Sequence, residues 1–314
     1  MSRPRPAPDE AQPVRRRRWR RRLAIALGFF ATAYAALWVV RCTRDFEPVA
    51  ARRFLAGGPL VIAHRGASAL ETEHTAAAYR RALADGADVL ELDVHRSLDG
   101  AIVVSHDRSL ERALGVPLLI AEHDLASLRA DLAARHPAAD PASLLPTLDE
   151  VMKGFPRARL NIELKADSAA LADAVAAAIE RHGRHDDVLV ASFHGDALER
   201  FRVSSRGRVA TSASLGEAAR FYVCYLLEVP CRPVYEALQV PPQLRRSWPH
   251  FRLDSAGFIE FAHQHGLEVH YWTIDDRAAI ERLLAAGADG IMTNDPGTAV
   301  AARAARAAQA SRTP

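Results

Sequence analysis

Two residue types are scarce in this 314-residue chain. Lysine occurs only as Lys153 and Lys165, and cysteine only as Cys42, Cys224 and Cys231. No Cys/His spacing typical of a structural zinc site accompanies the cysteines, which excludes that class of protein. Cys224 and Cys231 are close enough in sequence to form a small-loop disulfide in an oxidising compartment, or they are two separate buried thiols; the sequence leaves both open.

Acidic residues are almost missing from the N-terminus. Residues 1–22 contain nine arginines against Asp9 and Glu10, a net charge of +7, so the other residues together carry −4 of the chain's +3. The next 18 residues, 23–40, are uncharged and would span ~27 Å as a helix, about one bilayer core. The positive-inside rule then predicts a cytoplasmic basic segment at 1–22, a transmembrane anchor at 23–40, a linker at 41–59 and an extracytoplasmic domain.

Three other interpretations of this N-terminus are weaker. A cleaved signal peptide has a shorter apolar run and a small-residue cleavage site, which is not seen after Val40. A lipoprotein would have a small residue before Cys42, where this chain has Arg41. A nucleic-acid-binding tail fits poorly with an apolar helix and an acidic remainder, so we expect no nucleic-acid partner.

Strand and helix patterns alternate through residues 60–300. Short apolar runs predict strands at 60–63, 89–94, 160–165, 188–193, 209–212, 237–240, 268–274 and 290–293, with a hairpin partner at 101–105. Helical patterns at 75–85, 169–181 and 277–286 lie between several of them. Eight strands alternating with helices predict an α/β fold, a (β/α)₈ TIM-type barrel, followed by a tail at 301–314.

Polar residues lie at the ends of the first strands, where such barrels form their sites. Glu91 and Asp93 are two residues apart on a strand, so both side chains face one side and can share a hard cation such as Ca²⁺ or Mg²⁺. Arg65 offers a planar fork for phosphate oxygens. His64 and His106 can act as general base and general acid. Together these groups meet the needs of phosphodiester hydrolysis.

With these residues the chain resembles the glycerophosphodiester phosphodiesterases, from about residue 60 to residue 296. The motifs that carry the resemblance are His64-Arg65-Gly66, Glu91-Leu92-Asp93-Val94, the stretch from Asp99 to Asp107, Ile162-Glu163-Leu164-Lys165, Trp272-Thr273 and the stretch from Asp289 to Pro296. Five or more blocks in the family's order make a specific match.

The resemblance implies a role for each matched residue. Glu91, Asp93 and Glu163 would bind a divalent metal, and His64 and His106 would be the acid/base pair. Arg65 and Lys165 would contact the phosphate. Trp272 would line the pocket near the alcohol of the substrate.

One segment departs from the family pattern. Thr72-Glu73-His74-Thr75 stands where the family usually has Pro-Glu-Asn-Thr. Glu73 is retained and is expected to orient Arg65 or a metal-bound water. We interpret His74, like His123 and His136, as a surface or loop histidine.

The sequence therefore predicts a membrane-anchored, metal-dependent enzyme that hydrolyses glycerophosphodiesters to sn-glycerol 3-phosphate and an alcohol. The alternatives are a lysophospholipase D on the same barrel and a catalytically inactive binding module, although an inactive module would be expected to have lost metal ligands.

The apolar stretch 221–230 is either a flap that meets lipid or a buried barrel helix, which is the commoner structure for such a run. The oligomeric state is not predicted.

Overall fold

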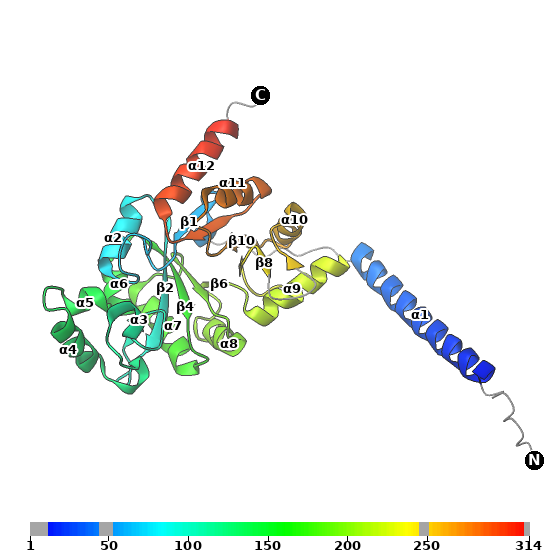
Figure 1. The fold of residues 1–314 in the computed structure, drawn as a ribbon, viewed down its shortest axis with the longest axis horizontal. Helices are drawn as coiled ribbons and strands as arrows, with labels where there is room; N and C mark the ends of the chain where they lie inside the picture. Colours follow the sequence, from blue (N-terminus) through cyan, green and yellow to red (C-terminus); the bar gives the residue numbers. More distant parts are fainter. Residues whose placement is uncertain (1–11, 44–52, 245–250, 311–314) are drawn as a thin grey trace, which may run out of the picture.

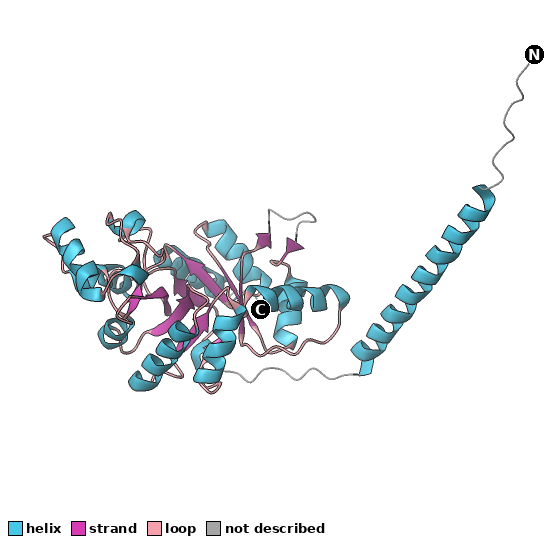
Figure 2. Cartoon of the chain, turned by 90° about the horizontal axis from the view of Figure 1, so that it is seen from below, coloured by secondary structure: helices cyan, strands magenta, loops and turns pink. Residues whose placement is uncertain are grey.

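The computed structural model of the chain describes residues 12–43, 53–244 and 251–310. The predicted segments 1–22, 41–59 and 301–314 therefore lie partly outside the described residues. Helices surround a central sheet in both views (Figure 1, Figure 2).

Eight parallel strands of the described residues form the barrel. Their order in the sheet is β6-β5-β4-β2-β1-β11-β10-β7. A parallel bridge between Ser212 and Ala237 brings the two ends of this order together. The strands are β1 (Leu60–Ala63), β2 (Val89–Arg96), β4 (Arg159–Leu164), β5 (Val188–Ala191), β6 (Ala210–Thr211), β7 (Ala237–Val240), β10 (Glu268–Tyr271) and β11 (Gly290–Thr293). The prediction of a TIM-type α/β barrel is confirmed.

Three further strands lie outside the barrel order. They are β3 (Ile102–Val104), β8 (Gln243–Leu244) and β9 (Phe251–Arg252). β3 pairs antiparallel with the end of β2 and is the hairpin partner predicted at 101–105. β8 pairs antiparallel with β9.

The helices are α1 (Gln12–Thr43), α2 (Ala76–Ala84), α3 (Glu111–Leu114), α4 (Leu125–Arg135), α5 (Pro141–Leu144), α6 (Leu148–Gly154), α7 (Ala169–His182), α8 (Gly195–Ser204), α9 (Leu215–Leu227), α10 (Ala256–Gln264), α11 (Arg277–Ala286) and α12 (Pro296–Ala310), with 3₁₀ turns η1 (Arg53–Leu55) and η2 (Ile120–Glu122). The three barrel helices predicted at 75–85, 169–181 and 277–286 correspond to α2, α7 and α11, and their ends agree to within one residue; the other helices of the barrel domain had no predicted bounds. Side-chain caps fix several starts: Thr75 caps α2, Ser168 caps α7 and Asp276 caps α11.

The barrel interior is filled by apolar side chains from several strands. Leu60, Ile62, Val89 and Leu189 are each no more than 2% exposed and belong to one cluster. Phe54 of η1 packs in the same cluster, although it falls within the segment predicted as a linker. The packed interior holds the strand ends in fixed positions, so the side chains that follow them are held as well.

Helix α1 contains the predicted anchor at residues 23–40 and stands apart from the barrel in Figure 1. Among the described residues, the structure has no helix with a stretch long and apolar enough to cross a bilayer, so it does not confirm the anchor. The side chains of residues 35 and 37–40 lie outside the described residues.

The stretch 221–230 is largely helical, since most of it lies in α9, but it is not a buried barrel helix. Phe221 is the buried residue of α9, whereas Val223, Leu226 and Leu227 are exposed.

The sequence left open whether Cys224 and Cys231 are separate thiols or a disulfide. In the structure they form a disulfide, which joins Cys224 of α9 to Cys231.

Candidate active site

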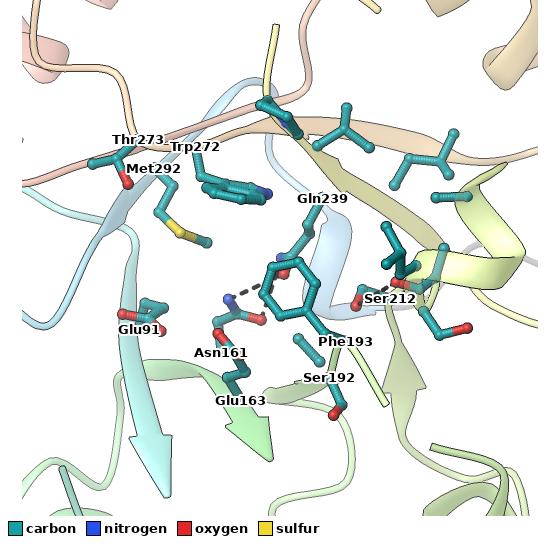
Figure 3. A pocket seen from close by; sticks show the side chains of 18 of the residues that line it. Glu91, Asn161, Glu163, Ser192, Phe193, Ser212, Gln239, Trp272, Thr273 and Met292 are labelled. Carbon is teal, nitrogen blue, oxygen red and sulfur yellow. Dashed lines mark hydrogen bonds between the residues drawn. The ribbon is translucent and has the colours of Figure 1, made fainter. Parts of the chain in front are cut away.

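The predicted site residues meet at one end of the barrel. His64 and Arg65 follow β1, Glu91 and Asp93 lie in β2, and Glu163 lies in β4. In the β2–β4 register Asp93 is directly opposite Glu163. Figure 3 shows Glu91 and Glu163 facing the same cavity from these two strands.

A tight turn after β1 sets the position of Arg65. Its backbone is in the left-handed region, with φ 57°, and its N–H donates to Glu91 Oε2 at 2.7 Å. Gly66 follows with φ 83°, and a Cβ there would lie 2.8 Å from the Cβ of Ala78 in α2. Glycine is therefore required by both the dihedral angle and the close approach of the helix.

Three carboxylates form an acidic cluster. Glu91, Asp93 and Glu163 each offer one oxygen, and these oxygens lie within 4.8 Å of one another. Burial and the charge of Asp93 raise the pKa of Glu163 to about 7 and raise that of Glu91 well above its usual value. Carboxylates this close together repel one another unless a proton or a cation lies between them. An all-oxygen donor set of this kind fits Ca²⁺ or Mg²⁺.

Two cations border the acidic cluster. Arg65 Nη1 donates to Glu73 Oε2 at 3.2 Å, and its buried Nε lies 3.7 Å from Asp93 Oδ2 without a hydrogen-bond acceptor. Lys165 Nζ lies 3.1 Å from Glu163 Oε1 and 3.4 Å from Asp93 Oδ1. Glu73 also pairs with Arg112 at 2.5 Å, so it links Arg65 to Arg112.

His64 is held by Asn294, which follows β11, and through Asn294 by Asp275, which follows β10. Its Nδ1 lies 2.7 Å from Asn294 Oδ1, and Asn294 Nδ2 donates to Asp275 Oδ2 at 2.7 Å. Because an amide oxygen only accepts, His64 Nδ1 is the donor and Nε2 keeps its lone pair. Burial lowers the pKa of His64, which favours the neutral ring. Asn294 lies in the last of the matched motifs, Asp289 to Pro296, but no role was predicted for it; its position after a barrel strand was the available signal.

His106 has a different partner. Its Nδ1 lies 2.7 Å from Asp107 Oδ1, and Asp107 Oδ2 accepts from Arg112 Nε at 2.5 Å. Burial lowers the pKa of His106, while the carboxylates of Asp93 and Asp107 oppose that shift. The Asp107 carboxylate carries a full negative charge that stabilises the doubly protonated ring of His106, whereas the neutral Asn294 amide raises the pKa of His64 only through its hydrogen bond.

His74 lies in the turn before α2, so it is a loop histidine as predicted, but it is not at the surface. The side chain is 3% exposed, with Nε2 2.9 Å from Asp93 Oδ2 and Nδ1 3.0 Å from the Tyr79 hydroxyl. A left-handed backbone at residue 74, with φ 61°, accompanies this inward placement. The hydrogen bond from His74 lowers the pKa of Asp93 although burial alone would raise it.

Trp272, which follows β10, lies on the wall of a cavity of about 370 Å³ that includes His64, Arg65 and Glu163. Its ring meets Phe193 edge-to-face, with centroids 5.8 Å apart (Figure 3). Asn161 and Gln239, joined by hydrogen bonds of 3.3 and 3.4 Å, also line the cavity.

All nine site residues predicted from the sequence lie in or beside this end of the barrel.

Residues 64–298 match the sequence model of the glycerophosphoryl diester phosphodiesterase family. The chain belongs to this family. The enzyme class predicted from the sequence, a glycerophosphodiester phosphodiesterase, is thereby confirmed.

Individual members of the family resemble the chain over most of its length. A glycerophosphodiester phosphodiesterase of Caldanaerobacter subterraneus is 29% identical over 247 residues, which cover 77% of this chain and 96% of that protein. The human lysophospholipase D GDPD1 is 27% identical over 260 residues, covering 75% and 83%. The crystal structure of a glycerophosphodiester phosphodiesterase from Agrobacterium tumefaciens superposes with a TM-score of 0.61 at 25% identity, covering 78% of this chain and 99% of that one.

Proposed function

We propose that the chain is a membrane-anchored, metal-dependent phosphodiesterase that hydrolyses glycerophosphodiesters to sn-glycerol 3-phosphate and an alcohol. The observation that carries the proposal is the grouping of the three carboxylates with Arg65 and two differently held histidines. The names of the relatives support the substrate class.

Glu91, Asp93 and Glu163 would hold the divalent metal. The crowding of their oxygens and the raised pKa values of two of them fit a site completed by a cation. When bound, Ca²⁺ or Mg²⁺ would supply positive charge that offsets the charge of the phosphate. Arg65 and Lys165, on the border of the cluster, would bind the phosphate oxygens and fix the orientation of the diester.

The two histidines would divide the proton transfers. His64 Nε2 carries a lone pair and would accept a proton from the attacking oxygen, which is water or a neighbouring glycerol hydroxyl. His106, with Asp107 behind it, would donate a proton to the leaving alkoxide as the phosphorus–oxygen bond breaks. The ring of His106 becomes easier to protonate when an anionic diester lies beside it, since opposite charges raise the pKa of an imidazole.

We propose that residues 23–40 anchor the enzyme in a membrane, with residues 1–22 in the cytoplasm and the barrel outside. Large apolar side chains project from several sides of α1, among them Ile25, Leu27, Phe29 and Phe30, each more than 60% exposed. A helix that is apolar on all sides is typical of a bilayer. The Cys224–Cys231 disulfide supports an oxidising compartment for the barrel.

A lysophospholipase D activity is the second candidate. The resemblance to the human lysophospholipase D supports it, because the same groups would act on a diester that bears a lipid. The bond broken is again the one between phosphorus and the head-group oxygen, and the product is then lysophosphatidate.

The reaction is tested by incubating the full-length protein in mild detergent with glycerophosphocholine or glycerophosphoethanolamine, in Ca²⁺, Mg²⁺ or EDTA. The proposal predicts metal-dependent release of glycerol 3-phosphate, seen by phosphorus NMR. No turnover of either diester by folded, metal-supplemented protein would contradict it.

For the anchor, the proposal predicts that the protein stays in the membrane fraction after high-salt and alkaline washes and leaves it when residues 1–40 are removed.

A further inference from the structure

The active-site cavity has a second part that the proposed chemistry does not use. Besides the catalytic groups, its wall is formed by Leu215, Ala219 and Tyr222 of α9, Leu238 of β7 and Phe258 of α10. Figure 3 shows Trp272 and Phe193 lining the same cavity as Glu91 and Glu163. The catalytic groups therefore open directly onto a largely apolar chamber.

Charge is confined to one end of this cavity. Every charged side chain and every histidine among its described lining residues belongs to the catalytic group, namely His64, Arg65, Glu91, His106, Glu163 and Lys165. The remaining polar lining residues are uncharged amides and hydroxyls. A cationic head group would thus find no carboxylate in the chamber, whereas an apolar chain would leave water for a matching surface.

The helix that walls the chamber is also apolar on its outer side. Leu215, Ala219, Val223 and Leu226 recur at intervals of three and four residues, which places them along one face of α9. Leu215, Val223 and Leu226 are 64%, 52% and 55% exposed. An exposed apolar stripe that continues into an apolar cavity is typical of a surface that takes up lipid.

A polar groove adjoins the catalytic groups at His106 and Lys165. It is lined by His95, Asp107, Arg108 and Arg112, and it shares His106 and Lys165 with the apolar cavity. A diester bound at Arg65 and Lys165 would therefore border both an apolar space and a polar space.

We propose that the chamber binds the acyl chain of a lysophospholipid, which makes a lipid-bearing diester the preferred substrate. The acyl-glycerol half would lie in the chamber, and the head group would lie in the polar groove beside His106. Water adds to phosphorus with loss of a proton to His64, the bond to the head-group oxygen breaks, and His106 protonates that oxygen. The products are lysophosphatidate and the free head-group alcohol. This inference rests on the proposed phosphodiesterase function.

The test compares substrates that differ only in acyl length. Full-length protein is assayed with glycerophosphocholine and with hexanoyl, octanoyl and decanoyl lysophosphatidylcholine, each as monomers. If the chain enters the chamber, kcat/KM rises by up to about fourfold for each added methylene until the chamber is full, as expected for burial of a methylene. Turnover of glycerophosphocholine with no rise along the series overturns the inference and leaves the proposed function intact. No turnover of any diester contradicts both.

A variant that narrows the chamber separates a loss of acyl-chain binding from a general loss of activity. Ala219 is exposed on α9 and lines the cavity, so Ala219→Trp adds bulk there without disturbing the core. Val203→Trp is the matched control, since Val203 is 65% exposed on α8 and does not line the cavity. We expect Ala219→Trp to lower kcat/KM for the decanoyl substrate about tenfold or more relative to kcat/KM for glycerophosphocholine, the value of two or more buried methylenes, while Val203→Trp leaves this ratio unchanged. An unchanged decanoyl rate, or an equal loss on both substrates, contradicts the proposal.

Discussion

The buried imidazole of His74 lies 2.9 Å from Asp93, one of the three carboxylates of the acidic cluster. An ionised carboxylate only accepts hydrogen bonds, so His74 Nε2 is the donor, and the Tyr79 hydroxyl at 3.0 Å faces Nδ1. His74 thus engages Oδ2 of Asp93, while Oδ1 faces Lys165. Partners of this kind orient metal-binding carboxylates in many enzymes.

His74→Ala is therefore predicted to weaken divalent-metal binding by about 10–100-fold, the usual cost of losing such a partner. Calorimetric titration of Ca²⁺ or Mg²⁺ into EDTA-treated protein measures the effect. Tyr79→Phe is the control, because it removes the hydroxyl behind His74 but leaves the contact with Asp93, and we expect a smaller loss. Wild-type metal affinity in folded His74→Ala would show that His74 does not position the ligand.

The sequence pattern could not reveal the place of His74. A lone histidine between polar residues is usually exposed, and nothing in the spacing predicts the left-handed backbone that accompanies its inward placement. The one signal was that it occupies the asparagine position of the family motif.

His106→Ala is predicted to lower turnover of glycerophosphocholine by ~10²–10⁴, the usual contribution of a general acid or base. Folding should be unaffected, since the side chain is about one-third exposed. Steady-state rates together with the circular dichroism spectrum and the melting temperature check both statements. A near-normal rate would remove His106 from the mechanism.

Asp107→Asn tests which histidine is the acid. The Asp107 carboxylate opposes the lowering of the pKa of His106, so its removal lowers that pKa further. If His106 must be protonated to donate, activity is lost as pH rises through its pKa. The basic limb of the kcat–pH profile is therefore expected to move to lower pH. The acidic limb, which we assign to His64, should stay in place; movement of the acidic limb alone would reverse the two assignments.

Leu226→Asp probes the outer face of α9. Leu226 is exposed and does not line the cavity, so the substitution should leave hydrolysis of monomeric substrates unchanged. We expect the rate on micellar lysophosphatidylcholine to fall, because a charge on this face disfavours contact with lipid. Val203→Asp on α8 serves as the control for an added exposed charge. Equal rates of Leu226→Asp and wild type on micelles would exclude α9 as the lipid-facing surface.

Much of the fold and site was predictable because the signals were local. Apolar runs marked the strands, and residues that follow parallel strands converge at one end of a barrel, so His64, Glu91 and Glu163 could be placed together. The role of Asn294 depends on a contact across 230 residues, which local patterns do not contain. Hydrophobicity alone left both a lipid-facing flap and a buried helix open for the stretch 221–230; in the structure α9 buries Phe221 and leaves Val223, Leu226 and Leu227 exposed.

The central claim is that Glu91, Asp93 and Glu163 hold a divalent cation on which phosphodiester hydrolysis depends. The most direct measurement titrates Ca²⁺ or Mg²⁺ into EDTA-treated full-length protein and follows metal binding and glycerophosphocholine hydrolysis in the same samples, beside Glu91→Gln. We predict that hydrolysis is absent in EDTA, returns in step with metal binding, and does not return in folded Glu91→Gln at the metal concentrations that saturate the wild type. Full hydrolysis in EDTA, or wild-type binding and turnover in Glu91→Gln, would contradict the account.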